Sequence, residues 1–181
     1  MTGIRITVWD GDEHELARAA DLYAQTFAEA PYLEDASAAR ASFVERIHRY
    51  AITKPDVRLL LAWDGTDAVA LALGTGIAAG DWWRGRMAAL LDEDVLRRWF
   101  GDACFCVMEL AVRRSHRRGG VAAALMEELL ADVPYATAVL SRYAEAEAAA
   151  QFYAALGWAE IATGIRIGDS PELCVLARDL R

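Results

Sequence analysis

The spacing of apolar residues in the first part of the chain predicts a strand followed by two helices. Residues 4–9 alternate apolar and polar side chains, which is the period of a half-buried strand. Apolar residues then recur at helical spacing from Leu16 to Phe27. A second helical stretch, from about Ser37, carries the apolar residues Phe43, Val44, Ile47 and Tyr50. Two helices are therefore expected after the first strand.

The next segment predicts a β-hairpin and then a helical insertion. Two apolar runs, residues 57–63 and 68–73, flank residues 64–67, whose sequence Asp-Gly-Thr-Asp is typical of a turn. Residues 80–101 have a helical centre and carry four large aromatic side chains. We expect this stretch to form a helical insertion between strands.

The second half predicts a strand, a glycine turn, a helix and another strand. Residues 103–112 are an apolar run, Gly119 and Gly120 follow, and Val121 begins a helical pattern. Residues 138–141 have the composition of a short buried strand, so these elements are expected to form a βαβ unit with a right-handed crossover. The chain then predicts a helix over residues 144–156 and an antiparallel pair of strands over residues 158–167 and 173–177.

Length and composition are those of a globular protein, and the order of predicted strands and helices is that of an α/β fold. The 181 residues are 55% hydrophobic and 25% charged, and the apolar residues are spread evenly, so no second compositional block separates off. We therefore expect a single domain over residues 1–181, with residues 80–101 as its insertion.

The charge balance excludes whole classes of partner. With 19 Lys+Arg and 27 Asp+Glu the formal net charge is 19 − 27 = −8. Nucleic acids and anionic membranes both select a cationic surface, so neither is an expected partner.

No apolar run is long enough to span a membrane, and the start of the chain lacks the apolar region of a secretion signal. Cys104 and Cys106 are two positions apart in one predicted strand, so they cannot easily form a disulfide, and we expect a cytoplasmic protein.

One local exception to the acidic balance is a candidate anion site. Residues 113–118 read Arg-Arg-Ser-His-Arg-Arg and lead through Gly119 and Gly120 into the predicted helix. The first N–H groups of a helix have no internal partner and favour anions, and glycine removes the Cβ atoms that would block a phosphate. The stretch is neither a nucleotide P-loop nor a dinucleotide fingerprint. On these residues alone, a phosphate site and an exposed basic turn are both open.

Two motifs, in this order, resemble those of the GNAT superfamily of acyl-CoA-dependent N-acyltransferases. Residues 117–122 read Arg-x-x-Gly-x-Ala, similar to the family's pyrophosphate loop, and residues 152–158 read Phe-Tyr-x-x-x-Gly-Trp, similar to its later aromatic-glycine motif. The resemblance covers residues 57–177. It implies a GNAT-like fold, whose mixed, mostly antiparallel central sheet is flanked by helices and splayed between the strand that ends near Val112 and the strand near Leu140.

The resemblance also implies acetyl-CoA as the acyl donor and assigns residues to it. Main-chain N–H groups at the turn would hold the pyrophosphate, and the strand before the turn would pair with the pantetheine arm. The first group is Arg117, Arg118, Gly119, Gly120, Val121, Ala122 and Ala123, and the second is Leu110, Ala111 and Val112. Ala146 stands where many members carry an Asn that contacts pantetheine.

Two residues are candidates for acid–base chemistry. Tyr153 matches the family tyrosine that protonates the leaving thiolate, although a tyrosine beside Phe152 on an apolar helix is also typical of a core. Glu109 is the only carboxylate in its apolar run, and burial would raise its pKa toward that of a general base. A hydrogen-bonded structural Glu is the alternative.

The acceptor is expected to be a primary amine. Acidic and aromatic residues suit a cation with apolar area, and the candidates are Tyr32, Glu34, Trp82 and Trp83. A small cationic molecule, similar to an antibiotic or a polyamine, is favoured over a protein N-terminus or lysine. A catalytically silent acyl-CoA-binding regulatory module is a further alternative. No Cys/His cluster has metal spacing, so no metal is expected, and a homodimer is left open.

Overall fold

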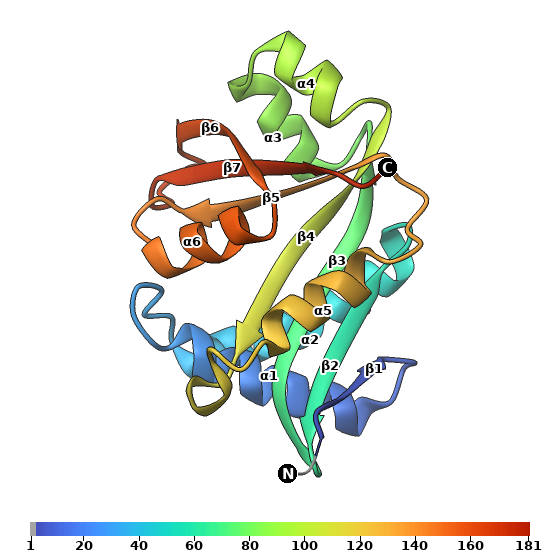
Figure 1. The fold of residues 1–181 in the computed structure, drawn as a ribbon, viewed down its shortest axis with the longest axis vertical. Helices are drawn as coiled ribbons and strands as arrows, with labels where there is room; N and C mark the ends of the chain where they lie inside the picture. Colours follow the sequence, from blue (N-terminus) through green and yellow to red (C-terminus); the bar gives the residue numbers. More distant parts are fainter. Residues whose placement is uncertain (1–2) are drawn as a thin grey trace. The chain divides into compact units, whose positions relative to one another are not determined.

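The computed structural model describes residues 3–181. The chain forms two compact units. The first unit holds the chain up to residue 74 together with residues 109–131, and the second holds residues 75–108 and 132–181. Within the described residues a seven-stranded sheet has the order β1-β2-β3-β4-β5-β7-β6 (Figure 1). Strands β3 (Asp67–Ala78) and β4 (Ala103–Val112) each contribute residues to both units.

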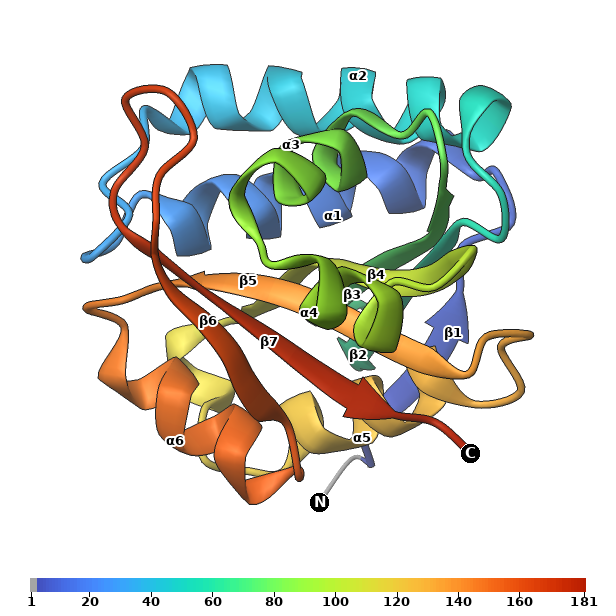
Figure 2. The ribbon, with the colours of Figure 1, turned by 90° about the horizontal axis from the view of Figure 1, so that it is seen from above.

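The first unit is an antiparallel set of strands with helices on both faces. Besides parts of β3 and β4, its elements are β1 (Arg5–Val8), α1 (Glu13–Phe27), α2 (Ala36–Thr53), β2 (Arg58–Asp64), a short 3₁₀ helix η1 (Arg114–His116) and α5 (Val121–Leu130). Helices α1 and α2 lie side by side against one face of β2 and β3, and α5 covers the other face (Figure 2). The predicted hairpin is confirmed, because β2 and β3 pair antiparallel from Arg58↔Gly74 to Asp64↔Asp67.

Side-chain caps explain where the first two helices begin. The Asp12 carboxylate accepts a hydrogen bond of 2.8 Å from the Glu15 amide at the start of α1, and the Asp35 carboxylate accepts one of 2.8 Å from the Ala38 amide at the start of α2. Each cap satisfies an amide that the helix cannot. The Asp35 cap therefore fixes where the segment between the helices ends, and that segment carries Tyr32 and Glu34.

The second unit is built around β5, β7 and the helical insertion. Its remaining elements are α3 (Trp82–Leu90), α4 (Glu93–Trp99), β5 (Thr137–Tyr143), α6 (Glu147–Ala155), β6 (Ala159–Ile165) and β7 (Leu173–Asp179). Met87 of α3 and Phe100 are fully buried with Val139 and Val175 in one apolar cluster, while α6 covers the opposite face of β5 and β7 (Figure 2). The insertion is thus part of the core of this unit.

The predicted βαβ unit is present, with β4 and β5 parallel. Their register pairs are Phe105↔Ala138 and Cys106↔Val139. Past these pairs the described residues include no further paired positions between the two strands. The other registered pairs, β1–β2, β2–β3, β5–β7 and β6–β7, are antiparallel, so the sheet is mixed and mostly antiparallel as expected. The splay itself, like the single domain, stays a prediction.

The start of α6 differs from its prediction, and β3 runs to Ala78, beyond the predicted end at residue 73. The helical pattern starts at Ala144, whereas α6 begins at Glu147. The Ala144 amide donates a hydrogen bond of 2.8 Å to the Glu172 carbonyl, and the Ala146 amide donates one of 3.1 Å to the Tyr143 carbonyl. The backbone here is therefore held in a turn by the end of β5 and the residue before β7.

The state of the cysteines and the length of the helices were both considered in the sequence. Cys104, Cys106 and Cys174 are free and buried, in agreement with the expectation that the first two do not form a disulfide. Among residues 3–181 no helix is both long and apolar enough to cross a membrane.

Candidate functional site

The turn between β4 and α5 has the backbone of an anion cradle. Arg118 and Gly120 adopt left-handed conformations, with φ of +66° and +82°. Gly120 is the N-cap of α5 and places no side-chain cap on the first amides of the helix. A Cβ at Gly120 would meet no heavy atom within 4 Å, so the space in front of the turn is open. The exposed amides at the start of α5 are free of a capping side chain and suit an anionic group.

The arginines around this turn divide into two kinds. Arg113 donates a hydrogen bond of 3.1 Å to the Ala68 carbonyl, and Arg117 donates to the Val112 carbonyl at 3.0 Å and the Glu29 carboxylate at 2.8 Å. Arg114 and Arg118 are exposed, and their side chains have no hydrogen-bond or ion-pair partner among the described residues. Only the second pair has side chains uncommitted to the fold.

His116 fastens the start of the turn to the β2–β3 hairpin. Its Nε2 lies 3.2 Å from an Asp64 carboxylate oxygen, and its Nδ1 lies 2.9 Å from the Ser115 hydroxyl. A Cβ at Gly119 would lie 3.4 Å from the His116 carbonyl oxygen, a close approach that glycine eases. The turn is thus held to the β2–β3 hairpin through His116.

The strand residues predicted to pair with pantetheine lie at the end of β4. Ala111 is buried, and Leu110 and Val112 are half-buried. The Arg113 amide donates a hydrogen bond of 2.8 Å to the Val69 carbonyl of β3, which anchors this end of the strand. The Val112 carbonyl accepts the hydrogen bond from the Arg117 guanidinium. The pairing of Leu110, Ala111 and Val112 with pantetheine stays a prediction.

Glu109 lies in a buried group of charged and aromatic side chains. Its carboxylate is 2.7 Å from the Arg46 guanidinium, and the two side chains are 12% and 20% exposed. The guanidinium also lies 5.4 Å from the centre of the Tyr23 ring and 5.7 Å from that of Phe43. Glu34, half-buried between α1 and α2, interacts electrostatically with both Glu109 and Arg46.

Burial gives Glu109 the proton affinity of a base that works near neutrality. It raises the pKa of Glu109 to about 7, and the negative charge of Glu34 adds to the rise. The Arg46 guanidinium opposes both effects without cancelling them. Burial also raises the pKa of Glu34, and it raises that of Tyr23, which keeps its phenol protonated. The ion pair between Glu109 and Arg46 therefore lies in a poorly solvated place, and the charge of Glu34 also acts on Glu109.

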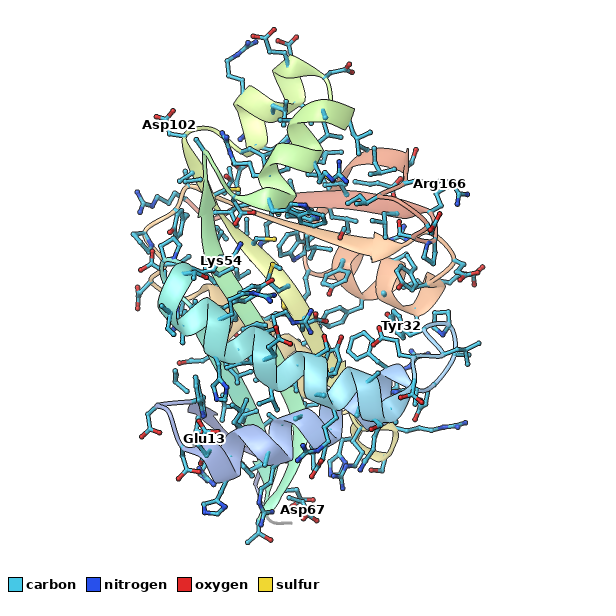
Figure 3. All side chains as sticks on the ribbon, turned by 180° about the vertical axis from the view of Figure 1, so that it is seen from behind. Glu13, Tyr32, Lys54, Asp67, Asp102 and Arg166 are labelled. Carbon is cyan, nitrogen blue, oxygen red and sulfur yellow. The ribbon has the colours of Figure 1, made fainter. Side chains whose placement is uncertain are left out.

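The four predicted acceptor residues fall into different units. Tyr32, labelled in Figure 3, and Glu34 lie in the first unit, on the segment between α1 and α2. The Tyr32 ring is 4.7 Å from that of Phe27. Trp82 and Trp83 belong to the second unit, where Trp82 is exposed and Trp83 packs 5.9 Å from Phe100. Of the four, Glu34 is the residue whose charge acts on Glu109.

Tyr153 is buried in the second unit, on α6. Its ring lies 5.1 Å from that of Phe152 and 5.9 Å from that of Trp158, both edge to face. The Tyr153 carbonyl accepts a hydrogen bond of 3.1 Å from the Trp158 amide. The motif residues of this segment therefore pack on one another, which fixes the direction of the tyrosine side chain.

Arg46 and Tyr23 are the members of the charged group that were not singled out in the sequence. Arg46 is three residues after Phe43 and four before Tyr50, so it lies on the apolar face of α2, and that position is the signal that could have identified it. Tyr23 lies within the apolar pattern from Leu16 to Phe27 that predicted α1. No group of three or more metal-ligating side chains occurs in residues 3–181.

Comparison with known proteins decides the family. The sequence profile of the acetyltransferase (GNAT) domain matches residues 59–160, more than half of the chain. The chain belongs to the GNAT family. The turn before α5 and the motif on α6 both lie inside the matched region, as the resemblance implied.

Solved structures agree with the family at the level of the fold. A GNAT-family acetyltransferase from Desulfovibrio desulfuricans is 13% identical, with 99% of this chain and 100% of that chain covered at a TM-score of 0.66. The ribosomal-protein-S18-alanine N-acetyltransferase from Escherichia coli is 16% identical, with coverages of 98% and 94% and a TM-score of 0.64. Arabidopsis thaliana NAA60, solved with acetyl-CoA, is 14% identical, with coverages of 98% and 99% and a TM-score of 0.67. No curated protein matches the chain by sequence.

Membership makes this GNAT protein an N-acetyltransferase, and acetyl-CoA is the acetyl donor that the family uses. The α/β fold with a mixed sheet flanked by helices is likewise the expected one. The acceptor is a separate question, which depends on the chain's own residues.

Proposed function

We propose that this GNAT protein acetylates a primary amine of a small cationic molecule, with Glu109 as the general base. The observation that carries the proposal is the mostly buried ion pair of 2.7 Å between Glu109 and Arg46, on which the charge of Glu34 also acts. When both carboxylates are ionised, the three groups sum to one negative charge. A single alkylammonium neutralises that charge.

The base is needed because the acceptor arrives protonated. A free alkyl ammonium has a pKa of about 10, and only the neutral amine can attack a thioester. A carboxylate whose pKa is about 7 accepts that proton far more readily than an ordinary glutamate. Glu109 would take the proton as the N–H bond of the ammonium breaks, which leaves a neutral amine and a neutral carboxyl.

The turn before α5 fits the pyrophosphate of acetyl-CoA. The main-chain N–H groups from Arg117 to Ala123 would hold it, and the open space at Gly120 leaves room for it. When bound, acetyl-CoA supplies the acetyl group as an activated thioester. The backbone of Leu110, Ala111 and Val112 would bind the pantetheine arm.

Tyr153 would act as the general acid. It lies in the Phe-Tyr-x-x-x-Gly-Trp motif of residues 152–158, and its ring is held edge to face by Phe152 and Trp158. A phenol can donate its proton as the sulfur of the leaving group develops negative charge. Tyr32 and Glu34 would contact the acceptor from the segment between α1 and α2, and Trp82 and Trp83 are the further proposed contacts.

The test is the release of CoA from acetyl-CoA in the presence of a panel of amines and peptides. We expect turnover with small mono- and polycationic amines, and a strong loss of kcat in Glu109→Gln with CoA affinity unchanged. Turnover only with peptides would move the acceptor to a protein N-terminus or lysine. Tight CoA binding with no turnover across the panel would favour the regulatory alternative.

A further inference from the structure

Arg46 of α2 and Glu109 of β4 form a mostly buried ion pair in the first unit. The Nη1 atom of Arg46 lies 2.7 Å from Oε1 of Glu109. Among the described residues neither side chain forms a second ion pair. The Nε atom of Arg46 is buried and has no hydrogen-bond partner in the same part of the chain. The direction of the Glu109 carboxylate therefore depends on where the Arg46 guanidinium is held.

Aromatic rings of α1 and α2 hold that guanidinium. It lies 5.4 Å from the centre of the Tyr23 ring and 5.7 Å from that of Phe43, which are cation–π distances. The Tyr23 ring in turn stacks on Phe43 at 4.6 Å and on Phe27 at 4.3 Å, and all three residues are buried. Closely packed rings have few other positions, so the packing of two helices fixes the guanidinium together with its charge.

Other titratable groups face the pair without contacting it as an ion pair. The Glu34 carboxylate, on the segment between α1 and α2, acts by its charge on Glu109 and Arg46. The phenols of Tyr23 on α1 and Tyr50 on α2 also interact electrostatically with Arg46. Within residues 3–181, Arg46 is the charged group at ion-pair distance from Glu109.

We propose that Arg46 is a positioning residue for Glu109: its guanidinium, held by the Tyr23 and Phe43 rings, directs the Glu109 carboxylate and keeps it ionised to receive the acceptor proton. The inference rests on the proposed function, in which Glu109 is the general base. The step breaks an N–H bond of the acceptor ammonium and forms an O–H bond on Glu109. Arg46 keeps its charge throughout and acts on the reaction only through Glu109.

Arg46 has two separable effects in this role, one from its charge and one from its geometry. The charge favours the ionised carboxylate, so its removal should lower the ionisation constant of Glu109 about tenfold or more. The geometry matters because a base must face the proton it takes, and a displacement of about 1 Å can lower a rate about 10²-fold. Lysine keeps the charge but lacks the planar guanidinium that stacks on aromatic rings. Arg46→Lys should therefore keep most of the first effect and lose the second.

The first measurement is a pH titration of the Glu109 side-chain carboxyl by carbon NMR, in protein without acetyl-CoA. Glu109→Gln assigns the signal. Arg46→Met should raise the pKa of Glu109, and Arg46→Lys should restore most of the wild-type titration. Arg49→Met removes an exposed guanidinium from the same helix and is the matched control that should not move the signal. An unmoved titration in Arg46→Met would overturn the inference.

The second measurement is the pH profile of kcat with the best amine of the panel described above. Well above its titration Glu109 is ionised in every variant, so kcat on that plateau reports the direction of the carboxylate. Arg46→Met and Arg46→Lys should both lower the plateau, by up to about 10²-fold, with the Kd for CoA unchanged. The acidic limb should move to higher pH in Arg46→Met alone. Arg49→Met should keep both the plateau and the limb.

These outcomes separate the inference from the proposed function. A full plateau in Arg46→Lys would show that the guanidinium directs nothing, and this variant decides the point even if Arg46→Met does not fold. If the titration of Glu109 shifts in Arg46→Met and the acidic limb does not, Glu109 is not the base. The proposed function is then wrong on that point, although the ion pair itself stands.

Discussion

The Arg117 guanidinium donates a hydrogen bond of 2.8 Å to the carboxylate of Glu29, which follows α1. The carbonyl of the same Glu29 accepts hydrogen bonds from the amides of Tyr32 and Leu33 at 3.1 and 3.2 Å. One residue therefore joins the turn proposed for the pyrophosphate to the segment proposed for the acceptor. Binding at either place should be felt at the other.

Glu29→Gln is expected to weaken this link. Both side chains are about 40% exposed, so the pair is worth about 0.2–1 kcal/mol, or at most about fivefold in an equilibrium constant. The Kd for CoA and the KM for the acceptor should both rise by that factor. A double-mutant cycle with Arg117→Ala, read by calorimetry, measures the coupling. Additive effects of the two changes would show that the ion pair links nothing.

Gly120→Glu should abolish CoA binding. The new side chain places a carboxylate where a phosphate is expected and forces a non-glycine residue to φ of +82°. Gly168→Glu is the matched control, because Gly168 has φ of +60° and open space in the turn before β7. That control should bind CoA normally. Retained binding by Gly120→Glu, measured by calorimetry, would contradict the cradle.

Tyr153→Phe should lower kcat by about 10²-fold or more and leave CoA affinity within a few-fold, as expected for loss of a general acid. The ring packing against Phe152 and Trp158 is retained by phenylalanine, so the fold should not change. Tyr135→Phe, a second buried tyrosine of the same unit, is the control and should keep full turnover. Equal kcat values for the two variants would remove Tyr153 from the mechanism.

The stability of the protein should fall as pH rises from about 5 to 8. Below the ordinary glutamate pKa, Glu109 is protonated both folded and unfolded and costs nothing. Between that value and its folded pKa of about 7, the folded state holds a proton that the unfolded chain releases, so stability declines with pH. The full loss is about 3 kcal/mol at 1.36 kcal/mol per pKa unit.

Denaturant unfolding at several pH values checks this prediction. Glu109→Gln carries no titrating group there and should lose the decline, whatever its stability at low pH. Glu45→Gln, exposed on α2, should keep it. A wild-type protein whose free energy of unfolding is flat or rises over this range would contradict the raised pKa.

Arg58→Ala should destabilise the first unit through the end of α5. The guanidinium of Arg58, partly buried, donates a hydrogen bond of 2.5 Å to the Ala131 carbonyl, which follows the last residue of the helix. Loss of such a charged hydrogen bond costs about 1.5–3 kcal/mol. Arg18→Ala removes a comparable but exposed bond to the Thr66 carbonyl and should cost less. Equal melting temperatures for the two variants would contradict the capping role.

Patterns confined to one element were predictable from the sequence. The turn residues 64–67 specified the hairpin, and the alternation and helical spacing specified the order of strands and helices, which the structure confirms. The start of α6 was not predictable, because it depends on a hydrogen bond between Ala144 and Glu172, which are far apart in the chain. Local propensity carries no information on such a partner.

In the candidate site, too, some residues were predictable from a local pattern and others depend on packing between elements. Gly120 stands out because it follows Gly119 just before a helical pattern begins. Glu109 stands out because it is a charged residue in an apolar strand. The spacing of Arg46 from Phe43 and Tyr50 could have marked it as a residue of the apolar face of α2, but its pairing with Glu109 depends on the packing of α2 and not on any local pattern. The role of Glu34 depends on that same packing. The sequence alone therefore does not show which charged residues of separate elements form pairs.

The burial of the cysteines has a practical consequence for enzymology. All three thiols are enclosed in the second unit, and burial raises the pKa of Cys104 to about 12 and also raises that of Cys174. Disulfide reagents attack thiolates that they can reach, and the folded protein presents none of these three. An Ellman-type colour reaction on the native enzyme should therefore report product thiol with almost no protein background, and a slow rise in colour without acceptor would reveal unfolding.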